Sequence, residues 1–396
     1  MPASETALAL VDSYLPTLTT RALEGDRSRR FPVETIEEFR SGGLAATTTP
    51  VELGGVGVDQ IRDMMAVAHR IGQADASLGI AFNMHQTVSW GLSRAASAGI
   101  QGADDFLRHV GAGEVWLVAT VTEAGTNYFH PATTLTSEGD DWILTGSKVF
   151  ATGSPAATHF AVNTRVMSGP TADRLATVLV PAHLDGVLVH DDWHGLGMRA
   201  SGSGQVDFSS VRLGADTVIV PGGPWGEFSA ASVLGRAFGN AGNVAAIAGA
   251  ATAARVLARD RVRTGTRVGT NTLATRPGVQ VSLGELEAEH YALAAVLERL
   301  GRDMDRSAAS PPTDIDEAHA VMARYQAAKL TVNRLSVSIV NRAMDLGGGA
   351  SYVDDHPVAS RYRDVRAGSF MQPFSPHEAL AYLGSVAAGT KPDPLT

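Results

Sequence analysis

The spacing of hydrophobic residues changes twice along this chain, and that change constrains the fold more than any other feature. Up to about residue 111, apolar residues recur every three or four positions, as in Met64, Val67 and Ile71, which is typical of helices buried on one face. Between residues 114 and 220 they alternate in short runs typical of strands, and from residue 227 the helical spacing returns. We therefore predict an α+β chain with an N-terminal helical domain (1–113), a middle antiparallel β-barrel or sandwich domain (114–222) and a C-terminal four-helix bundle (223–396).

The middle region lacks the helices that a doubly wound parallel sheet needs between its strands. The C-terminal region predicts long helices, because residues 316–344 contain no proline. Pro311 and Pro312 follow a polar stretch, so we expect residues 301–313 to form a loop between two antiparallel helices. The expected strands are 115–121, 133–137, 142–150, 159–163, 176–180, 187–190 and 204–211, and the expected bundle helices include 244–262, 284–300 and 316–344.

Charge and composition exclude several classes of function. Lysines and arginines number 32 and acidic residues 41, for a net charge of −9, and no basic block could neutralise consecutive phosphates, so we expect no nucleic acid partner. The absence of cysteine excludes disulfides, thiolate ligands and a thiol nucleophile, and scattered histidines predict no metal. Apolar runs fall short of the ~18 residues that span a bilayer. With acidic residues where a secretory signal has basic ones, these features predict a cytoplasmic protein without a membrane partner.

Four motifs, in this order, resemble those of the acyl-CoA dehydrogenase superfamily. Residues 121–127 (VTEAGTN) are similar to its TEPGAGSD loop, and residues 142–153 (WILTGSKVFATG) to the strand and loop that contain GSK. Residues 195–208 (GLGMRASGSGQVDF) closely follow its GMR-containing stretch, and residues 345–349 (DLGGG) with Arg363-Asp364 resemble the end of its bundle. The resemblance covers nearly the whole chain. It implies an acyl-CoA dehydrogenase-like fold and a flavin-dependent oxidoreductase, in a superfamily that includes monooxygenases such as dibenzothiophene monooxygenase.

The first two motifs supply what a flavin requires. A flavin needs an apolar slot for its ring, hydrogen-bond donors along its pyrimidine edge and a site for its phosphate. Thr122 and Thr152 stand at the ends of neighbouring expected strands, where hydroxyl and backbone N–H groups can meet a planar polar edge. The resemblance implies that Val121, Thr122, Phe150 and Thr152 contact FAD or FMN. Phe150 stands where many relatives have tryptophan and can still pack against the ring.

The loop after Thr122 departs from the family. Ala124 replaces the family's proline and Tyr128 its serine, a phosphate anchor. We expect Thr126 and Asn127 in a tight turn near the phosphates or the substrate.

The bundle departs from the family in its phosphate-binding arginine. A helix end that carries an R-x-t-F-G motif in relatives reads RVRTGTRVG at residues 261–269. The resemblance leaves Arg263 and Arg267 as candidates for the cofactor phosphate, since guanidinium pairs well with phosphate. Each could equally be a helix-end cation that satisfies carbonyls. By resemblance, Gly348 and Gly349 are further cofactor-binding candidates.

The base that a dehydrogenase requires is missing. Oxidation of an acyl thioester needs a carboxylate to remove the α-proton while a hydride leaves for the flavin. Many relatives carry this glutamate nine residues after the arginine of the RD motif. Counting from Arg363 leads to Gln372, whose amide cannot accept the proton. A relocated base would have to be Glu227 or Glu378.

We therefore predict a flavin-dependent monooxygenase of a small organic substrate, since a C4a-hydroperoxyflavin needs a dry pocket and nearby donors rather than a strong base. A separate reductase could supply the reduced flavin. Two alternatives remain: an acyl-CoA dehydrogenase with a relocated carboxylate, and a flavin-binding family member without turnover. The candidate catalytic residues are His85, Ser154, Gln372 and His377.

Three of the singled-out residues also have structural interpretations. His85 could be a core histidine with satisfied hydrogen bonds, and His377 a residue near a helix N-terminus. Arg199, in the third motif, could brace its turn by pairing with an acidic neighbour. For the assembly, relatives form dimers of dimers with flavin between subunits, and Ala-rich bundle helices pack well against copies, so we expect a homotetramer.

Overall fold

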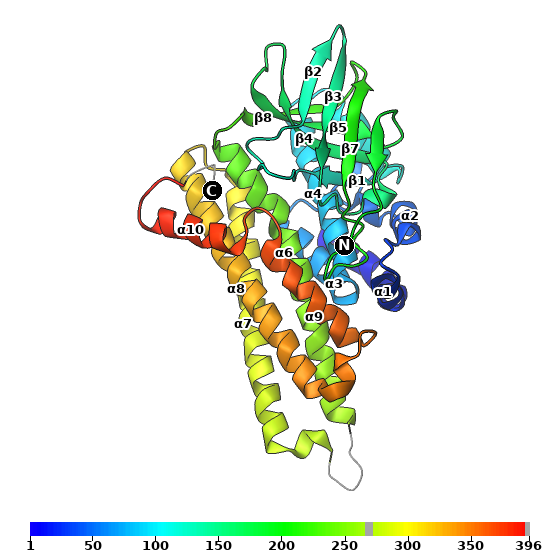
Figure 1. The fold of residues 1–396 in the computed structure, drawn as a ribbon, viewed down its shortest axis with the longest axis vertical. Helices are drawn as coiled ribbons and strands as arrows, with labels where there is room; N and C mark the ends of the chain where they lie inside the picture. Colours follow the sequence, from blue (N-terminus) through cyan, green and yellow to red (C-terminus); the bar gives the residue numbers. More distant parts are fainter. Residues whose placement is uncertain (266–271, 393–396) are drawn as a thin grey trace.

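The structure is a computed structural model that describes residues 1–265 and 272–392. The β region lies at one end of the molecule, the N-terminal helices lie beside its base, and the long C-terminal helices extend away from it as a stem (Figure 1). This order of helices, sheet and helices confirms the predicted fold class. The first strand begins at Leu117 and the first long C-terminal helix at Ala230. The domain boundaries after residues 113 and 222 stay a prediction.

The N-terminal region is helical, as its periodicity predicts. Helix α4 begins directly after Asp75, whose side chain accepts the N–H of Leu78 as an N-cap. Helices α3 and α4 both pack against the bundle helix α6, and α4 also contacts strand β1. The helices are α1 (Ala3–Ser28), α2 (Val33–Ser41), α3 (Ile61–Ala74), α4 (Ala76–Ser97) and α5 (Ala103–Gly111), with short 3-10 turns η1 (Leu44–Ala46) and η2 (Val51–Leu53).

The middle region is one open sheet of eight strands, which corresponds to the sandwich form of the prediction. The order is β6-β7-β3-β2-β4-β5-β8, with β1 beside β4. Most neighbouring pairs are antiparallel, while β1–β4 and β2–β4 are parallel. The strands are β1 (Leu117–Thr120), β2 (Thr134–Glu138), β3 (Asp141–Lys148), β4 (His159–Val166), β5 (Arg174–Pro181), β6 (Val187–Val189), β7 (Val206–Leu213) and β8 (Ile219–Pro224).

Seven strands fall where the alternation predicts them, and the eighth, β8, was missed. Its sequence contains Pro221 and Pro224, which ordinarily interrupt a ladder. Strand β8 lies at the edge of the sheet, next to β5 only, so its outer side needs no N–H donors. Prolines are therefore tolerated there.

The C-terminal region is a bundle in which α6 packs against α7, α8 and α9. The expected loop at residues 301–313 is wrong for its first part, because α7 continues to Ala309. Asp303 is buried there and accepts Nε of Arg299 at 2.8 Å, and Gly301 lets the helix approach Arg62. The remaining elements are η3 (Ser154–Ala156), α6 (Ala230–Thr264), η4 (Leu273–Thr275), α7 (Pro277–Ala309), α8 (Ile315–Gly347), η5 (Gly348–Tyr352), α9 (Pro357–Ala367), η6 (Gly368–Phe370) and α10 (Pro376–Ala387).

Helix α6 alone among the described helices is long and apolar enough to meet the length and composition criteria for a membrane span. Its apolar stretch is mostly buried against α3, α4, α7 and α8. These are the contacts of a core helix, and the low charge of its sequence reflects that burial.

Candidate functional site

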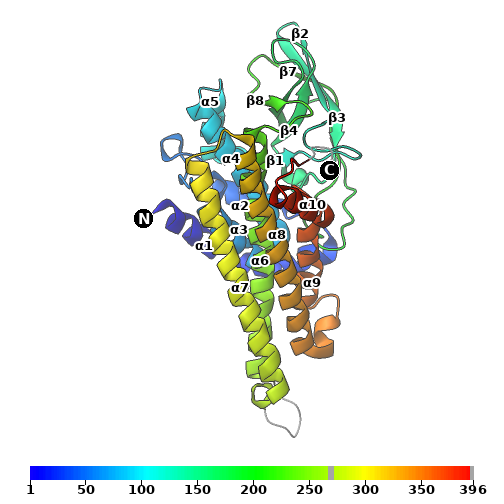
Figure 2. The ribbon, with the colours of Figure 1, turned by 90° about the vertical axis from the view of Figure 1, so that its left-hand side faces the viewer.

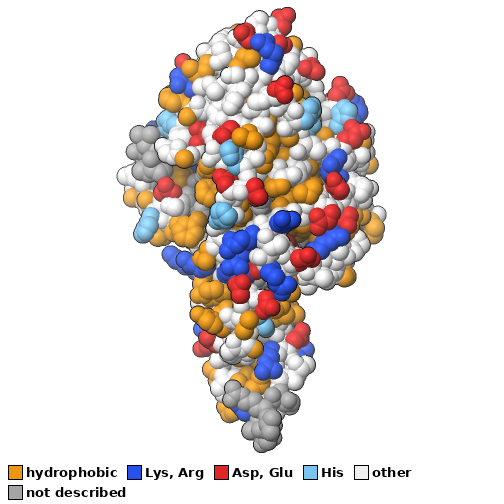
Figure 3. All heavy atoms as spheres, turned by 45° about the vertical axis from the view of Figure 1, so that its right-hand side comes forward, with side chains coloured by type: hydrophobic (Ala, Val, Ile, Leu, Met, Phe, Trp, Pro, Cys, Tyr) orange, Lys and Arg blue, Asp and Glu red, His pale blue; other side chains and the backbone are white. Residues whose placement is uncertain are grey.

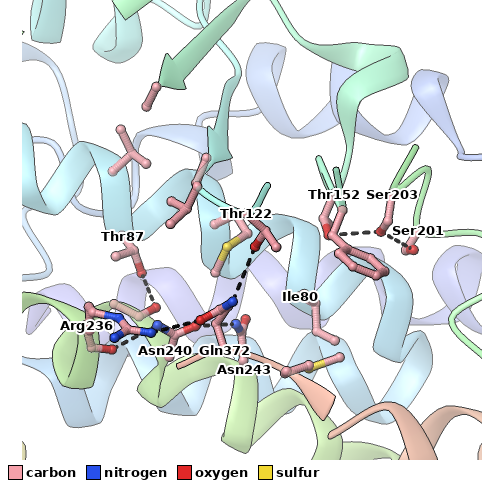
Figure 4. A pocket seen from close by; sticks show the side chains of 18 of the residues that line it. Ile80, Thr87, Thr122, Thr152, Ser201, Ser203, Arg236, Asn240, Asn243 and Gln372 are labelled. Atoms are coloured by element: carbon pink, nitrogen blue, oxygen red, sulfur yellow. Dashed lines mark hydrogen bonds between the residues drawn. The ribbon is translucent and has the colours of Figure 1, made fainter. Parts of the chain in front are cut away.

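A cavity of about 620 Å³ opens where the sheet meets α4, α6 and the segment after α9. Its volume is in the range of small-molecule sites. Figure 4 shows the labelled polar side chains from α4, α6 and the strand ends turned toward a common space. The walls come from α4 (Ile80, Met84, Thr87), from the strand ends (Val121, Thr122, Phe150, Thr152), from Trp193 and residues 195–198, from α6 (Arg236, Asn240, Asn243), and from Arg363, Arg366, Ala367 and residues 370–372.

The four residues expected to contact the flavin ring all line this cavity. Val121 and Thr122 follow β1, while Phe150 and Thr152 follow β3. The hydroxyl of Thr152 is 2.9 Å from Oγ of Ser203. The structure thus brings together two loops that lie about thirty residues apart in the sequence and lines one wall with hydroxyl groups (Figure 4).

Phe150 adopts a left-handed backbone conformation, with φ of 56°, and its side chain is 58% exposed. Its ring packs edge-to-face with the ring of Trp193 in the wall of the same cavity, and the two ring centroids are 6.0 Å apart. Met198, also in the wall, has φ of 52°. Positive φ is unusual for residues with large side chains, and such conformations cluster at functional sites.

A buried ion pair supports the Thr122 loop from behind. Nζ of Lys148, from the GSK motif, lies 2.5 Å from Oε1 of Glu123 and donates to the carbonyl of Asn163. Glu123 also accepts the N–H groups of Ala132 and Thr133. Burial raises the pKa of Glu123, but the Lys148 ammonium and the hydrogen bonds from Lys148, Thr133 and Ala132 together outweigh burial and hold that pKa below its usual value. Glu123 is therefore a structural anion rather than a base.

The third motif is braced, as the structural interpretation of Arg199 proposes. Arg199 pairs with Asp354 at 3.4 Å and lies 3.9 Å from Asp26. The N–H of Met198 donates to Oδ1 of the buried Asp364 at 2.7 Å. A side chain at Gly197 would lie 2.2 Å from the carbonyl oxygen of Arg363, so only glycine allows this approach. The third and fourth motifs thus contact one another directly.

Gln372, at the position of the missing glutamate, belongs to a polar chain across the cavity wall. Arg236 donates through Nη2 to Oε1 of Gln372 at 2.9 Å and to the carbonyl of Pro373 at 2.7 Å. Nε2 of Gln372 in turn makes a long contact of 3.5 Å with Oγ1 of Thr122. Figure 4 shows this chain running from α6 to the loop after β1. Gln372 therefore lies between α6 and an expected flavin contact.

A second buried cation holds the same segment. Nζ of Lys329 donates to the carbonyl of Phe374 at 2.7 Å and to that of Met371. Burial lowers the pKa of Lys329 to about 7. Arg236 and Lys329 together fix the backbone on both sides of Gln372.

The residues that line the cavity include no aspartate, glutamate or histidine, among the described parts of the chain. Its charged groups are Arg236, Arg363 and Arg366. Glu227 is exposed and outside the cavity, and Glu378 caps α10 by accepting the N–H of Ser375. Neither suggested replacement for the missing base reaches the site.

The structure does not bring His85 to the cavity. Its Nδ1 accepts the N–H of Leu117 at 2.9 Å, and its Nε2 donates to the carbonyl of Ala45 at 2.7 Å. The ring stacks on Trp116, and burial lowers the pKa of His85 to about 4. With both nitrogens engaged, His85 matches the core-histidine alternative.

Ser154 and His377 also lie outside the lining. Ser154 is buried, does not line the cavity, and donates its hydroxyl to the carbonyl of Gly202 at 3.1 Å. His377 is exposed near the N-terminus of α10, because Pro376 starts the helix there. Of the four candidate catalytic residues, the structure brings only Gln372 to the cavity.

The polar side chains of the turn after Thr122 are used within the turn. Thr126 donates to the carbonyl of His130, and Oδ1 of Asn127 accepts the N–H of Phe129 at 2.9 Å. Neither lines the cavity.

The remaining cofactor-binding candidates are far from this cavity in the chain itself. Arg263 is exposed in the last turn of α6, and Gly348 and Gly349 follow α8. These helix ends lie at the end of the stem away from the sheet (Figure 1). Arg267 lies outside the described residues.

Sequence reasoning missed Arg236. A signal was available, because Arg236 is the only charged residue between positions 230 and 254, in a stretch of mostly apolar and small residues. A charge on a buried helix needs a partner or a ligand. Among the described residues, no group of three histidine or acidic side chains could hold a metal ion, and the absence of a metal stays a prediction.

The walls fit a flavin. Hydroxyls at Thr122 and Thr152 can meet a polar ring edge, and the rings of Phe150 and Trp193 can cover an apolar one. Nε of Arg363, in the wall, is buried without a partner in the described parts of the chain and offers a free donor.

Comparisons with known proteins agree with this geometry. Family models of the acyl-CoA dehydrogenase N-terminal, middle and C-terminal domains match residues 5–103, 117–211 and 237–372. The amino sugar nitrososynthase DnmZ of Streptomyces peucetius is 34% identical, covering 98% of this chain and 94% of its own. The L-evernosamine nitrososynthase of a Micromonospora species is 33% identical, covering 99% and 92%.

Among solved structures, KijD3 in complex with FMN and dTDP-3-amino-2,3,6-trideoxy-4-keto-3-methyl-D-glucose superimposes with a TM-score of 0.90. It is 31% identical, and the match covers 99% of this chain and 95% of that one. With all three parts matched in order, the chain belongs to the acyl-CoA dehydrogenase family of flavin-dependent oxidoreductases, as its four motifs predicted.

Proposed function

We propose that this protein is a flavin-dependent monooxygenase that uses FMN and oxidises the amine nitrogen of a nucleotide-linked amino sugar. Support for the substrate class comes from relatives at 31–34% identity, which are nitrososynthases or hold an amino-sugar nucleotide and FMN. The similarity extends over nearly the whole of each chain. A separate reductase would supply the reduced flavin.

The observation that carries this proposal is the composition of the cavity wall. Desaturation of an acyl thioester requires a carboxylate beside the flavin, and no Asp or Glu lines the cavity among the described residues. An amide, Gln372, stands at the expected position and is held by Arg236. Oxygen transfer to an amine needs no such carboxylate, because the neutral nitrogen is itself the nucleophile.

In this proposal Val121, Thr122, Phe150 and Thr152 hold the flavin ring. When bound, reduced flavin supplies the two electrons with which O₂ is divided, one oxygen atom going to the substrate and the other leaving as water. The chain's own contribution is to orient the amine, exclude water through the apolar walls and keep the polar edge satisfied.

Arg263, Gly348 and Gly349 would contact the flavin of a neighbouring subunit in a tetramer, since they lie far from the cavity of their own chain.

The test combines purified protein, FMN, an NADH-dependent flavin reductase and the amino-sugar nucleotide found in KijD3. We expect O₂ consumption above the amine-free background and a product heavier by one oxygen atom in mass spectrometry. Thr122→Ala should weaken FMN binding or change its spectrum. The proposal is wrong if acyl-CoA bleaches the bound flavin without O₂ while the amine gives no oxygenated product.

A further inference from the structure

Arg236 is a buried cation in the wall of the cavity. It projects from the second turn of α6, its exposed fraction is 8%, and burial lowers its pKa to about 10, so it stays charged at neutral pH. Taking a guanidinium out of water is costly unless an anion or several acceptors replace the water. The partners that compensate Arg236 therefore indicate what the cavity is built to bind.

The protein compensates this charge only in part. Within the described residues, no ion pair is formed by Arg236, and Glu378 raises its pKa only from beyond ion-pair distance. Both of its hydrogen bonds, to Gln372 and Pro373, are made through Nη2. Nε and Nη1 have no acceptor among the described residues, although a guanidinium carries five N–H groups.

Aromatic rings surround the rest of the guanidinium. The centroids of Tyr128 and Phe129 are each 5.1 Å from Cζ of Arg236, and that of Phe374 is 5.0 Å away. Such rings stabilise a cation through their faces but accept no strong hydrogen bond. The unused N–H groups are not among the buried polar atoms without a partner, so they are open to the cavity and can donate to an oxygen acceptor bound there.

The position of Arg236 in the cavity indicates which part of a bound ligand would contact its guanidinium. Through Gln372 it is linked to Thr122, which we place against the flavin ring. Asn240, one helical turn along α6, lines the same wall and donates to the carbonyl of Arg236. The guanidinium therefore lies at the reacting end of the cavity.

Resting on the proposed function, we propose that Arg236 binds an oxygen atom of the sugar next to the amine that is oxidised, and so determines specificity at the reacting end of the substrate. A carbonyl or hydroxyl oxygen supplies the acceptor that Nε and Nη1 lack. An ammonium group has no carboxylate partner among the described lining residues and is repelled by Arg236, so the amine is held as the free base.

The test compares two probes in the FMN-loaded protein by isothermal titration calorimetry. One is dTDP-3-amino-2,3,6-trideoxy-4-keto-3-methyl-D-glucose and the other is dTDP alone, both of which KijD3 binds. In Arg236→Met we expect the affinity for the sugar nucleotide to fall at least about tenfold, while the affinity for dTDP changes by less than about twofold. Arg236→Lys keeps the charge and should lose less.

Arg259→Met, on an outer turn of the same helix, is the matched control and should leave both affinities unchanged. Equal losses for both probes in Arg236→Met and Arg236→Lys would overturn the assignment, because Arg236 would then act on the diphosphate or on the fold. No loss for either probe would also overturn it. If the wild-type protein binds dTDP but not the sugar nucleotide, or binds neither, the proposed substrate class itself fails. Should Arg236→Met not fold, the comparison rests on Arg236→Lys.

Discussion

At position 372 an amide oxygen lies 2.9 Å from a buried guanidinium, where relatives with dehydrogenase activity carry a base. The same Arg236 that holds this amide would change the chemistry of any carboxylate placed there. A single side chain on α6 thus sets what residue 372 can do. The pKa of the buried Asp364 also depends on its surroundings, because burial raises it to about 7.

Gln372→Glu should not create an acyl-CoA dehydrogenase. The new carboxylate would pair with Arg236, which lowers its pKa and makes it a poor base for an α-proton. Under anaerobic conditions we expect butyryl-CoA to leave the flavin absorbance unchanged. Bleaching of the flavin band in this single variant would contradict the prediction, and Arg236→Met/Gln372→Glu serves as the control in which the ion pair cannot form.

Asp364→Asn should remove one contribution to stability that declines as pH rises. Burial raises the pKa of Asp364 to about 7, against the influence of Arg361 and reinforced by Asp75 and Asp26. At this site the folded protein therefore binds more protons than the unfolded chain between about pH 4 and 7, so the contribution of Asp364 to wild-type stability declines as pH rises through this range. Asparagine can still accept the N–H of Met198.

Thermal unfolding of both proteins from pH 5 to 8 checks this. The stability of Asp364→Asn relative to wild type should rise up to about pH 7 and then level off. Parallel curves across that range would show that Asp364 does not titrate as expected.

At the scale of elements, small residues decide how closely the helices cross. Helix α3 approaches α6 through glycines, and a side chain at Gly72 would lie 2.4 Å from the carbonyl oxygen of Ala246. This close packing brings α4 and the cavity side of α6 next to the strand ends. Figure 2 shows α6 in the interior of the bundle and α7 along its outside.

Gly249→Ala should destabilise the protein, while Gly384→Ala should not. A Cβ at Gly249 would lie 2.4 Å from the carbonyl oxygen of His69, on the backbone of α3, so the helices must separate at a cost of about 1–3 kcal/mol. Gly384 is exposed on α10 with open space around it, and alanine there should stabilise by up to about 1 kcal/mol. Urea denaturation measures both. Equal effects of the two substitutions would refute the role of close helix packing.

At the scale of the whole molecule, the single chain leaves hydrophobic surface uncovered. On one face, hydrophobic side chains gather at mid-height, with a group of basic side chains directly below (Figure 3). On the outer helix α7, Tyr291 is 79% and Val281 63% exposed. Large exposed apolar groups on a long helix favour burial against another copy.

We therefore expect a homotetramer in which α7 contributes to an interface. Val281→Glu with Tyr291→Glu should shift the protein toward smaller species in sedimentation velocity, because charges would be buried without partners. Arg302→Ala, a polar position on the same helix, is the control and should leave the distribution unchanged. A monomeric wild-type protein at micromolar concentration would contradict the expectation.

Local sequence patterns were enough to predict the order of the three parts, seven of the eight strands and the loops that carry Thr122 and Thr152. Hydrophobic spacing reflects the local geometry of helices and strands, so it can be read without knowing the fold. Motif resemblance also identified position 372 as the place where relatives carry the glutamate. Only nine residues separate it from Arg363, so a count along the sequence is enough to find it.

Which polar side chains face the cavity depends on how the helices and the sheet pack together. His85 and Arg236 both lie on largely apolar helices, yet His85 finds partners at Ala45 and Leu117 in the core, while Arg236 faces Gln372 across the cavity wall. The same holds for strand β8, whose prolines are tolerated because it lies at the sheet edge. Such outcomes depend on contacts between residues far apart in the chain, and these contacts exist only once the helices and the sheet have packed together.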